Sequence, residues 1–219
     1  MKTIIFAGGL GSRMGSLTEE IPKPMIKIGN LPIIVHIMQI YSKQNYNNFI
    51  LALGYKHEVI RDYIINLKYY HNDIKIEFDK FNISTKSDSK NFFDNWNVEL
   101  IYTGLTNLKG SRLFKLKDYL EDDLNFLTYG DGLSNINLNE LVKFHKSHER
   151  ILTITGVRPY GRFGEITVEE NRVVNFDEKP KISNTIINGG FMIFNKKIFE
   201  YMSDKNDYDL ERDIFKSLI

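Results

Sequence analysis

Hydrophobic positions along this chain follow two spacings, one typical of buried strands and one typical of helices. Between short apolar runs, apolar residues recur every three or four positions, as in residues 57–69. Strands that alternate with helices are typical of crossover units on a parallel sheet, so the pattern predicts an α/β fold. The runs expected to form the sheet span residues 3–7, 48–53, 74–78, 98–102 and 125–129.

The remaining segments complete this picture. Residues 79–95 are polar and lack apolar periodicity, which predicts an inserted loop or hairpin. Asn137 precedes the last long helix as a cap. The predicted long helices span residues 31–41, 57–69, 113–120 and 138–148. Beyond residue 150 the chain becomes strand-rich, with strands at 151–157, 164–168, 172–176 and 186–194 and short helices at 196–202 and 209–218.

Composition narrows the class of protein. The chain has 219 residues, of which 42% are hydrophobic and 26% charged, values typical of a globular domain with a sizeable core. A net charge of +1 gives no general attraction to nucleic acid or anionic lipid. Zero cysteines exclude disulfides, thiolate zinc sites and thiol nucleophiles. Without a recognisable leader or an 18-residue apolar run, a cytoplasmic protein is expected.

The first apolar run leads into a glycine-rich loop, Gly8-Gly9-Leu10-Gly11-Ser12-Arg13. Bare backbone N–H groups after a buried strand can approach an anion closely, and Arg13 and Lys23 add positive charge. The loop lacks the third glycine of a dinucleotide fingerprint, where Met14 stands, and the Gly-Lys-Ser/Thr of a P-loop. A phosphate cradle is favoured over the alternative, a plain surface loop.

A second candidate site is Gly130-Asp131-Gly132, at the carboxyl end of an apolar run. Ligands bind at that edge of an open parallel sheet, and one carboxylate can hold Mg²⁺ against phosphate oxygens. The tripeptide alone is also typical of an ordinary turn. In combination with the glycine loop, it predicts one crevice lined by the ends of two strands.

Other polar positions are less specific. Glu178 and Lys179 precede a proline, where charge is usually a solvated turn, and Asn188 before two glycines is also typical of a bulge. Arg112 lies near a helix start, and its candidate contacts are phosphate, ribose or solvent. His145 and His148 have no third ligand nearby, so surface positions are favoured over a metal site. Trp96 is expected to pack where the inserted segment rejoins the sheet.

Taken together, these motifs resemble the sugar-nucleotide pyrophosphorylases, and among them the glucose-1-phosphate cytidylyltransferases. The resemblance runs in register along the whole chain and includes Trp96-Asn97-Val98, Gly161-Arg162-Phe163-Gly164 and Ile187-Asn188-Gly189-Gly190-Phe191. It implies a Rossmann-like mixed, mostly parallel sheet in a single domain of residues 1–219. Residues 1–150 would form the nucleotide-binding half, and residues 151–219 the acceptor-binding half.

The resemblance also implies the reaction and the roles of individual residues. A sugar 1-phosphate would attack the α-phosphorus of CTP in the presence of Mg²⁺, giving a CDP-sugar and pyrophosphate. Since the acceptor phosphate is already anionic, no general base is needed. On the nucleotide side, the resemblance implies Gly8, Gly9, Leu10, Gly11 and Ser12 around the triphosphate, Arg13 at the departing pyrophosphate, Lys23 at the α-phosphate and Asp131 on the metal, with Gly104, Arg112, Thr128 and Gly130. On the acceptor side it implies Glu178, Lys179 and Asn188.

The sequence also departs from the family. Residues 79–95 match poorly, although the resemblance implies that this region makes subunit contacts in a homo-oligomer. The family's second metal ligand, in a Trp-Gln-x-Met-Asp motif, has no counterpart here, which is explained by a shortened chain, a differently completed site or weakened activity. Two alternative functions therefore stay open: transfer of the cytidylyl group to another phosphorylated acceptor, sugar or non-sugar, in surface-polysaccharide biosynthesis, and nucleotide binding without turnover.

Overall fold

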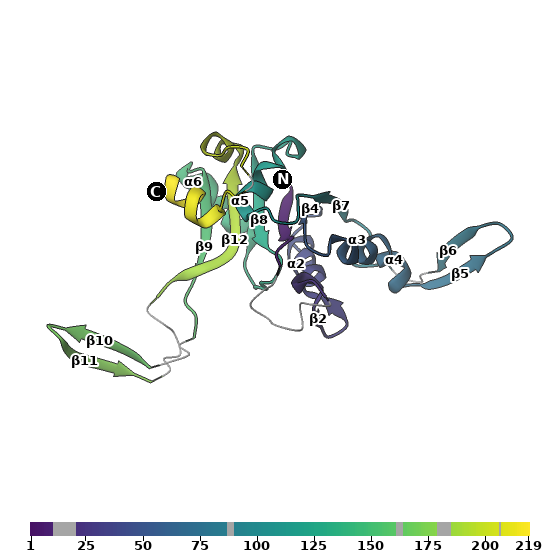
Figure 1. Ribbon diagram of the computed structural model, residues 1–219. Helices are drawn as coiled ribbons and strands as arrows, with labels where there is room; N and C mark the ends of the chain where they lie inside the picture. The colour runs from purple at the N-terminus through teal and green to yellow at the C-terminus, as the bar shows by residue number, and fades with distance from the viewer. Residues whose placement is uncertain (11–20, 87–89, 161–163, 179–184, 206) are drawn as a thin grey trace.

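The core of the molecule is a six-stranded sheet in the order β7-β4-β1-β8-β12-β9 (Figure 1). The computed structural model describes residues 1–10, 21–86, 90–160, 164–178, 185–205 and 207–219. Strands β7, β4, β1 and β8 are parallel, whereas β12 runs antiparallel to both β8 and β9. The strands are β1 (Thr3–Ala7), β4 (Asn48–Leu53), β7 (Asn97–Tyr102), β8 (Leu124–Tyr129), β9 (Leu152–Val157) and β12 (Ile187–Asn195). The predicted mixed, mostly parallel α/β sheet is confirmed.

Side chains that alternate along the strands divide the core into two layers. Ile5 and Ala7 of β1 face one cluster, and Ile4 and Phe6 face the other, as the period of two in a strand requires. Helices α2 (Ile33–Ser42), α3 (His57–Ile65) and α6 (Leu138–His148) cover the first face. The second face is covered by α5 (Lys109–Phe114) and by two short segments near the C-terminus, η4 (Lys196–Tyr201) and η5 (Leu210–Phe215).

Several helix boundaries differ from the predictions because local chemistry intervenes. Pro32 is the N-cap of α2, and Leu31–Pro32 (β3) pairs with Lys27–Ile28 (β2), so the helix begins two residues later than expected. The predicted helix 57–69 is interrupted at Asn66, after which α4 spans Leu67–Tyr70. The helix expected at 113–120 begins earlier, as α5, and ends in a 3₁₀ turn, η3 (Lys117–Tyr119).

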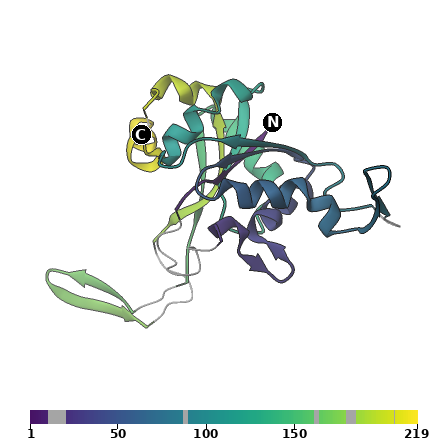
Figure 2. The same ribbon diagram turned by 45° about the vertical axis from the view of Figure 1, so that its right-hand side comes forward.

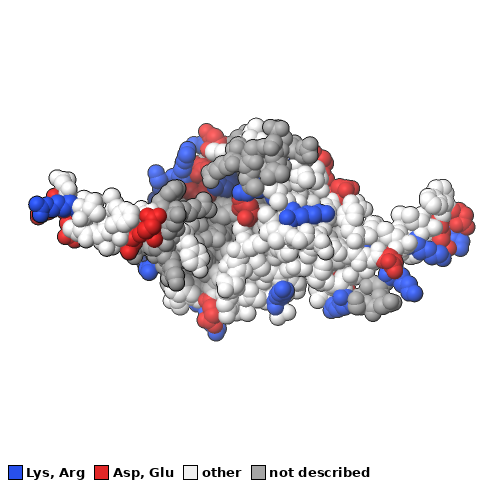
Figure 3. Space-filling model, turned by 90° about the horizontal axis from the view of Figure 1, so that it is seen from below, with Lys and Arg blue, Asp and Glu red and all other residues white. Residues whose placement is uncertain are grey.

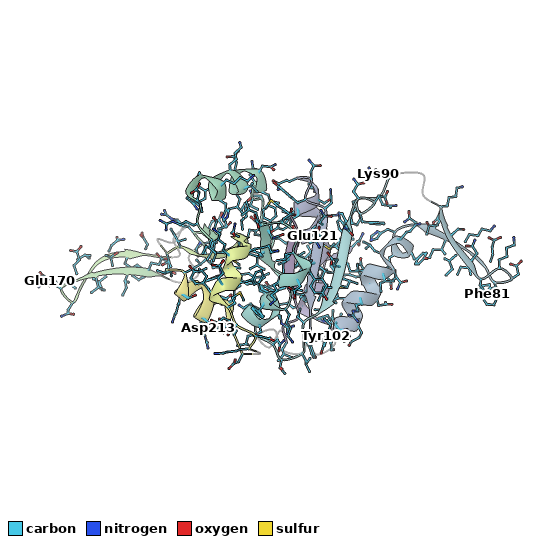
Figure 4. All side chains as sticks on the ribbon, turned by 90° about the horizontal axis from the view of Figure 1, so that it is seen from above. Phe81, Lys90, Tyr102, Glu121, Glu170 and Asp213 are labelled. Atoms are coloured by element: carbon cyan, nitrogen blue, oxygen red, sulfur yellow. The ribbon has the colours of Figure 1, made fainter. Side chains whose placement is uncertain are left out.

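Two hairpins extend from the body at opposite ends of the molecule (Figures 1 and 2). One pairs β5 (Asp73–Glu77) with β6 (Asn82–Lys86), and the other pairs β10 (Glu165–Glu169) with β11 (Arg172–Asp177). The prediction that 74–78 is a strand is confirmed, but its place in the main sheet was wrong, because its partner is the inserted segment. Phe81 and Glu170 mark the two tips (Figure 4).

Two single-residue expectations can be compared with the structure. The Asn137 side chain accepts hydrogen bonds from the backbone N–H groups of Asn139 and Glu140, which confirms the cap. Trp96 packs against Phe49 of β4 and Phe92 of the inserted segment, as expected. In the described part of the chain, no helix is long and apolar enough to cross a membrane.

The expectation that His145 lies at the surface was wrong. His145 belongs to α6 and is only 3% exposed. The ring lies 2.7 Å from the Thr153 hydroxyl, which the His148 ring also contacts at 2.9 Å. Burial, reinforced by the neighbouring His148, lowers the pKa of His145. The two rings thus share one hydroxyl, with His145 buried and His148 half-buried.

Candidate active site

The carboxyl ends of the parallel strands meet at one edge of the sheet, and the glycines predicted to bind nucleotide lie there. Gly8 and Gly9 follow β1, Gly54 follows β4 and Gly104 follows β7. Strands β1 and β8 are direct neighbours, so Gly130 and the first glycines of the loop stand on adjacent strands. Figure 3 views the molecule from below, the side to which these strands run, with acidic and basic side chains near one another on this face.

Lys23 and Asp131 form an ion pair at this edge. Lys23 opens the 3₁₀ turn η2 (Lys23–Met25), whose other two residues, Pro24 and Met25, are buried. A Cβ atom at Gly130 would lie 2.5 Å from the Phe6 carbonyl oxygen and 3.1 Å from Pro24, so only glycine permits this close approach. The buried turn and the tight glycine together bring the two charges face to face, with about a third of each side chain exposed.

Arg112 is buried behind the strand ends, with 3% of its surface exposed. Its Nη1 donates to the carbonyl oxygens of Leu53 (3.1 Å) and Gly104 (2.7 Å) and to the Thr103 hydroxyl (2.8 Å). Its Nη2 donates to the carbonyl oxygen of Gly8 at 2.9 Å and to that of Leu105. The alternative of a solvent-facing Arg112 was therefore wrong.

The guanidinium of Arg112 ties together the ends of three strands. Its acceptors belong to the segments that follow β1, β4 and β7, and burial lowers its pKa. Gly8 and Gly54 lie directly on the guanidinium, because a Cβ atom at either position would come within 2.8 Å of it. Arg112 thus positions the beginning of the glycine loop from behind, whatever the loop binds.

The other residues predicted on the nucleotide side are placed differently. Gly9 and Leu10 are exposed, and a Cβ atom at Gly9 would meet open space. Thr128 is fully buried in β8, where it pairs with Ile5 of β1. Gly104 has a φ of +105°, a conformation that favours glycine. Gly11, Ser12 and Arg13 lie outside the described residues.

Asn188, which was predicted on the acceptor side, lies at the start of β12. Its amide nitrogen donates to the Tyr129 hydroxyl at 2.9 Å, and its amide oxygen accepts from the Gly190 N–H at 2.9 Å. Glu178 is exposed just beyond β11, at the base of its hairpin. Lys179, the third residue predicted here, lies outside the described residues.

Three residues near Asn188 were missed by the sequence analysis. The Tyr129 hydroxyl donates to Glu211 of η5 at 2.6 Å, and Glu211 forms an ion pair with Lys109 of α5. Burial, the Glu211 carboxylate and other neighbours raise the pKa of Tyr129. Tyr129 lay within the motif already singled out, but nothing local in the sequence pointed to Glu211, which is 82 positions away.

The described residues supply a partial site for a divalent cation. Among them, no group of three or more His, Cys, Asp or Glu side chains is arranged to hold a metal ion. Asp131 offers one partly exposed carboxylate at the end of β8. Mg²⁺ commonly takes one or two carboxylates and completes its shell with phosphate oxygens and water, so this donor set fits a cation that arrives with a phosphate substrate.

Comparison with known protein families gives one match over almost the whole chain. The profile of the nucleotidyl transferase family matches residues 2–219. A probable glucose-1-phosphate cytidylyltransferase from Bacillus subtilis is 37% identical over 218 residues, which cover 100% of this chain and 84% of that protein. The glucose-1-phosphate cytidylyltransferase of Salmonella typhi is also 37% identical, over 93% of this chain and 79% of that protein.

A relative named for another nucleotide is more distant. The D-glycero-alpha-D-manno-heptose 1-phosphate guanylyltransferase of Aneurinibacillus thermoaerophilus is 30% identical over 99% of this chain and 84% of that protein. Among solved structures, HddC from Yersinia pseudotuberculosis, complexed with GMP-PN, has a TM-score of 0.71 and 25% identity, over 100% of this chain and 86% of that one. These similarities agree with the mixed, mostly parallel sheet described above.

Proposed function

Because this chain belongs to the nucleotidyl transferase family, whose named members are enzymes, we propose that it transfers CMP from CTP to a sugar 1-phosphate, specifically glucose 1-phosphate. The products would be a CDP-sugar and pyrophosphate. The choice of CTP is supported by the 37% identity to cytidylyltransferases, against 30% to the guanylyltransferase. The observation that carries the proposal is the Lys23–Asp131 ion pair beside the ends of β1 and β8.

In the proposed reaction, an oxygen of the sugar phosphate forms a bond to the α-phosphorus of CTP. The bond from that phosphorus to the oxygen bridging to the β-phosphate breaks, and its electron pair leaves with pyrophosphate. No proton has to move, since the attacking phosphate is already ionised. What the protein must supply is alignment of two anions and compensation of their charge.

The chain's own residues divide between these tasks. The Lys23 ammonium would neutralise the α-phosphate, and the glycine loop, held by Arg112 through Gly8, would receive the rest of the triphosphate, with Arg13 at the departing pyrophosphate. Asp131 would hold Mg²⁺, which when bound supplies positive charge to the phosphate oxygens. Asn188, Glu178 and Lys179 would bind the acceptor.

A second candidate is guanylyl transfer from GTP to a heptose phosphate. It is supported by the 30% identity to a heptose 1-phosphate guanylyltransferase and by the likeness to HddC complexed with GMP-PN. The two candidates share the same chemistry at phosphorus, and they differ in the base and the sugar that are recognised.

One experiment separates them. The purified protein is supplied with Mg²⁺, one of four nucleotides (CTP, UTP, dTTP or GTP) and one of several phosphorylated acceptors, including glucose 1-phosphate, a heptose 1-phosphate and inositol 1-phosphate, while pyrophosphate release is followed. The proposal expects the highest kcat/KM for CTP with glucose 1-phosphate. A preference for GTP, or for a non-sugar acceptor, would replace it with the corresponding alternative.

The proposal extends to assembly and location. We expect a homo-oligomer in the cytoplasm. The first expectation is supported by the exposed apolar side chains of the β5–β6 hairpin, in the region where the family resemblance implies subunit contacts. Light scattering of the purified protein measures the oligomeric state, and fractionation of the source cells measures the location.

A further inference from the structure

We propose that Glu211 is a positioning residue that acts through the Tyr129 hydroxyl to hold the Asn188 amide in a single orientation at the acceptor side of the site. The inference rests on the proposed function, since that function gives Asn188 its role in acceptor binding. It assigns a task to a carboxylate from the C-terminal part of the chain that the reaction itself does not use.

The hydrogen bonds form a chain in which each donor is determined. The Gly190 N–H can only donate, so the Asn188 atom that faces it at 2.9 Å is the amide oxygen. The amide nitrogen of Asn188 then donates to the Tyr129 oxygen at 2.9 Å. The single phenolic proton is therefore directed to Glu211, 2.6 Å away. An ionised carboxylate only accepts, so the Gly190 N–H and Glu211 fix the direction of these bonds from the two ends of the chain.

One cation contacts both partners of the Tyr129–Glu211 hydrogen bond. Lys109 forms an ion pair with Glu211 and its Nζ lies 5.1 Å from the centre of the Tyr129 ring, over its face. Glu211 is thus held as an acceptor by a cation that also contacts the residue it orients.

The backbone that carries Glu211 is fixed against α5. The Ser111 N–H donates to the Tyr208 carbonyl at 3.0 Å, and the Tyr208 N–H donates to the Ser111 hydroxyl at 2.9 Å. A Cβ atom at Gly110 would lie 2.6 Å from the Tyr208 carbonyl oxygen, so the two segments touch there. Asp209 caps η5 by accepting from the N–H groups of Glu211 and Arg212. Figure 4 marks η5 with Asp213.

The acceptor can bind only to the hydrogen-bonding groups of the Asn188 amide that Tyr129 and Gly190 do not already use. One N–H of its amide and one lone pair of its oxygen stay unused by the chain, and their positions are set once the amide orientation is set. In Glu211→Gln the new amide can donate to the Tyr129 oxygen. The phenolic proton is then free to turn towards Asn188, which favours a flipped amide and leaves the Gly190 N–H without its acceptor. Asn188 would then present two arrangements to the acceptor instead of one.

The test compares Tyr129→Phe and Glu211→Gln with the parent in steady-state kinetics with CTP and glucose 1-phosphate. Both variants are expected to raise the KM for glucose 1-phosphate about tenfold while the KM for CTP stays within about twofold, because only the acceptor side loses its orientation. Tyr46→Phe is the matched control, since its hydroxyl donates to an amide oxygen of Asn139 away from the site. Equal changes in both KM values, or no change in either, would overturn the inference.

A second measurement does not depend on turnover. In ¹⁵N-labelled protein, the side-chain amide signals of Asn188 are identified by their loss in Asn188→Asp. Tyr129→Phe and Glu211→Gln are expected to shift both signals, and Tyr46→Phe to leave them in place. If the parent transfers CMP to no sugar phosphate but the signals shift, the proposed function fails and the positioning chain stands. If the signals do not move, the chain is refuted whatever the activity.

Discussion

At the scale of single residues, the site depends on a few charged side chains whose positions are set by contacts with neighbouring residues. Lys23 and Asp131 face each other because a buried proline and a tight glycine bring two segments together, and Arg112 is surrounded by carbonyl oxygens. Such charges cost free energy when a partner is removed, because the remaining group stays desolvated. The effects of substitution therefore differ according to whether the group faces substrate or protein.

The Lys23–Asp131 pair faces substrate in the proposed reaction, so its loss is expected to affect catalysis more than stability. Lys23→Ala and Asp131→Asn should each lower kcat/KM at least 100-fold, about 2.7 kcal/mol of transition-state stabilisation, while the melting temperature changes little. The matched control is Lys143→Ala, which breaks the exposed Lys143–Glu140 pair at 2.9 Å on α6. Pyrophosphate release within about threefold of the parent in both site variants would contradict the assignment.

Arg112 faces protein, so its loss is expected to appear as instability. In Arg112→Met the carbonyl oxygens of Gly8, Leu53 and Gly104 each lose the hydrogen bond from the guanidinium, although the first two still accept from the backbone N–H groups of Tyr55 and Thr103. Hydrogen bonds to a charged group contribute about 1.5–3 kcal/mol each, so the free energy of unfolding should fall by roughly 3 kcal/mol or more. Urea unfolding measures it, with Arg172→Met, on an exposed hairpin strand, as the control. A stability equal to that of the parent would show that the guanidinium is dispensable.

His145 predicts a pH dependence whose sign follows from burial. Its pKa in the folded state lies below the ordinary value of 6.5, so the unfolded chain binds the proton more tightly. Stability from this group is complete above pH 6.5 and decreases as the pH falls from there towards the lowered pKa. The loss between pH 7 and pH 5 in urea unfolding should be smaller in His145→Gln than in the parent. An identical loss in both proteins would assign the dependence to other groups.

At the scale of elements, local patterns predicted most strands and helices but not their partners. The alternation of Ile74, Ile76 and Phe78 is a genuine strand signal, yet the strand pairs with the inserted segment and not with the main sheet. The alternation of apolar and polar residues does not distinguish these pairings. It shows which side chains share a face of the strand, and it does not show which strand or helix lies beside that face. Similarly, Pro32 was expected inside the first turn of α2, and a pairing with β2 makes it the cap.

The hairpin β5–β6 exposes apolar side chains on a two-stranded ribbon, which is marginally stable alone in water. Phe78 is 81% exposed and Phe81 is 96% exposed. If this surface joins copies of the chain, Phe78→Ser/Phe81→Ser should lower the mass measured by light scattering, with the fold retained. Ile65→Ser, which replaces a side chain that is 67% exposed on α3, is the control. The oligomeric contact would lie elsewhere if both variants keep the mass of the parent.

At the scale of the whole molecule, strand order explains why part of the site could be predicted. Apolar runs that end in Gly8 and in Gly130 were expected to line one crevice, and the sheet places β1 and β8 side by side. The Tyr129–Glu211 contact could not be predicted, because it depends on how η5 packs against α5, and no local pattern records that packing. Sequence patterns identify strand ends, whereas contacts made by irregular segments follow only from three-dimensional packing.

Helix α5 has a consequence for any attempt to redesign this protein. Its first residue, Lys109, supports the chain that orients Asn188, and three residues later Arg112 holds the loop after β1. Mutations in α5 chosen to admit a new sugar would therefore alter the nucleotide side at the same time, which makes selection for one substrate costly for the other. A library for acceptor engineering is therefore better placed outside α5.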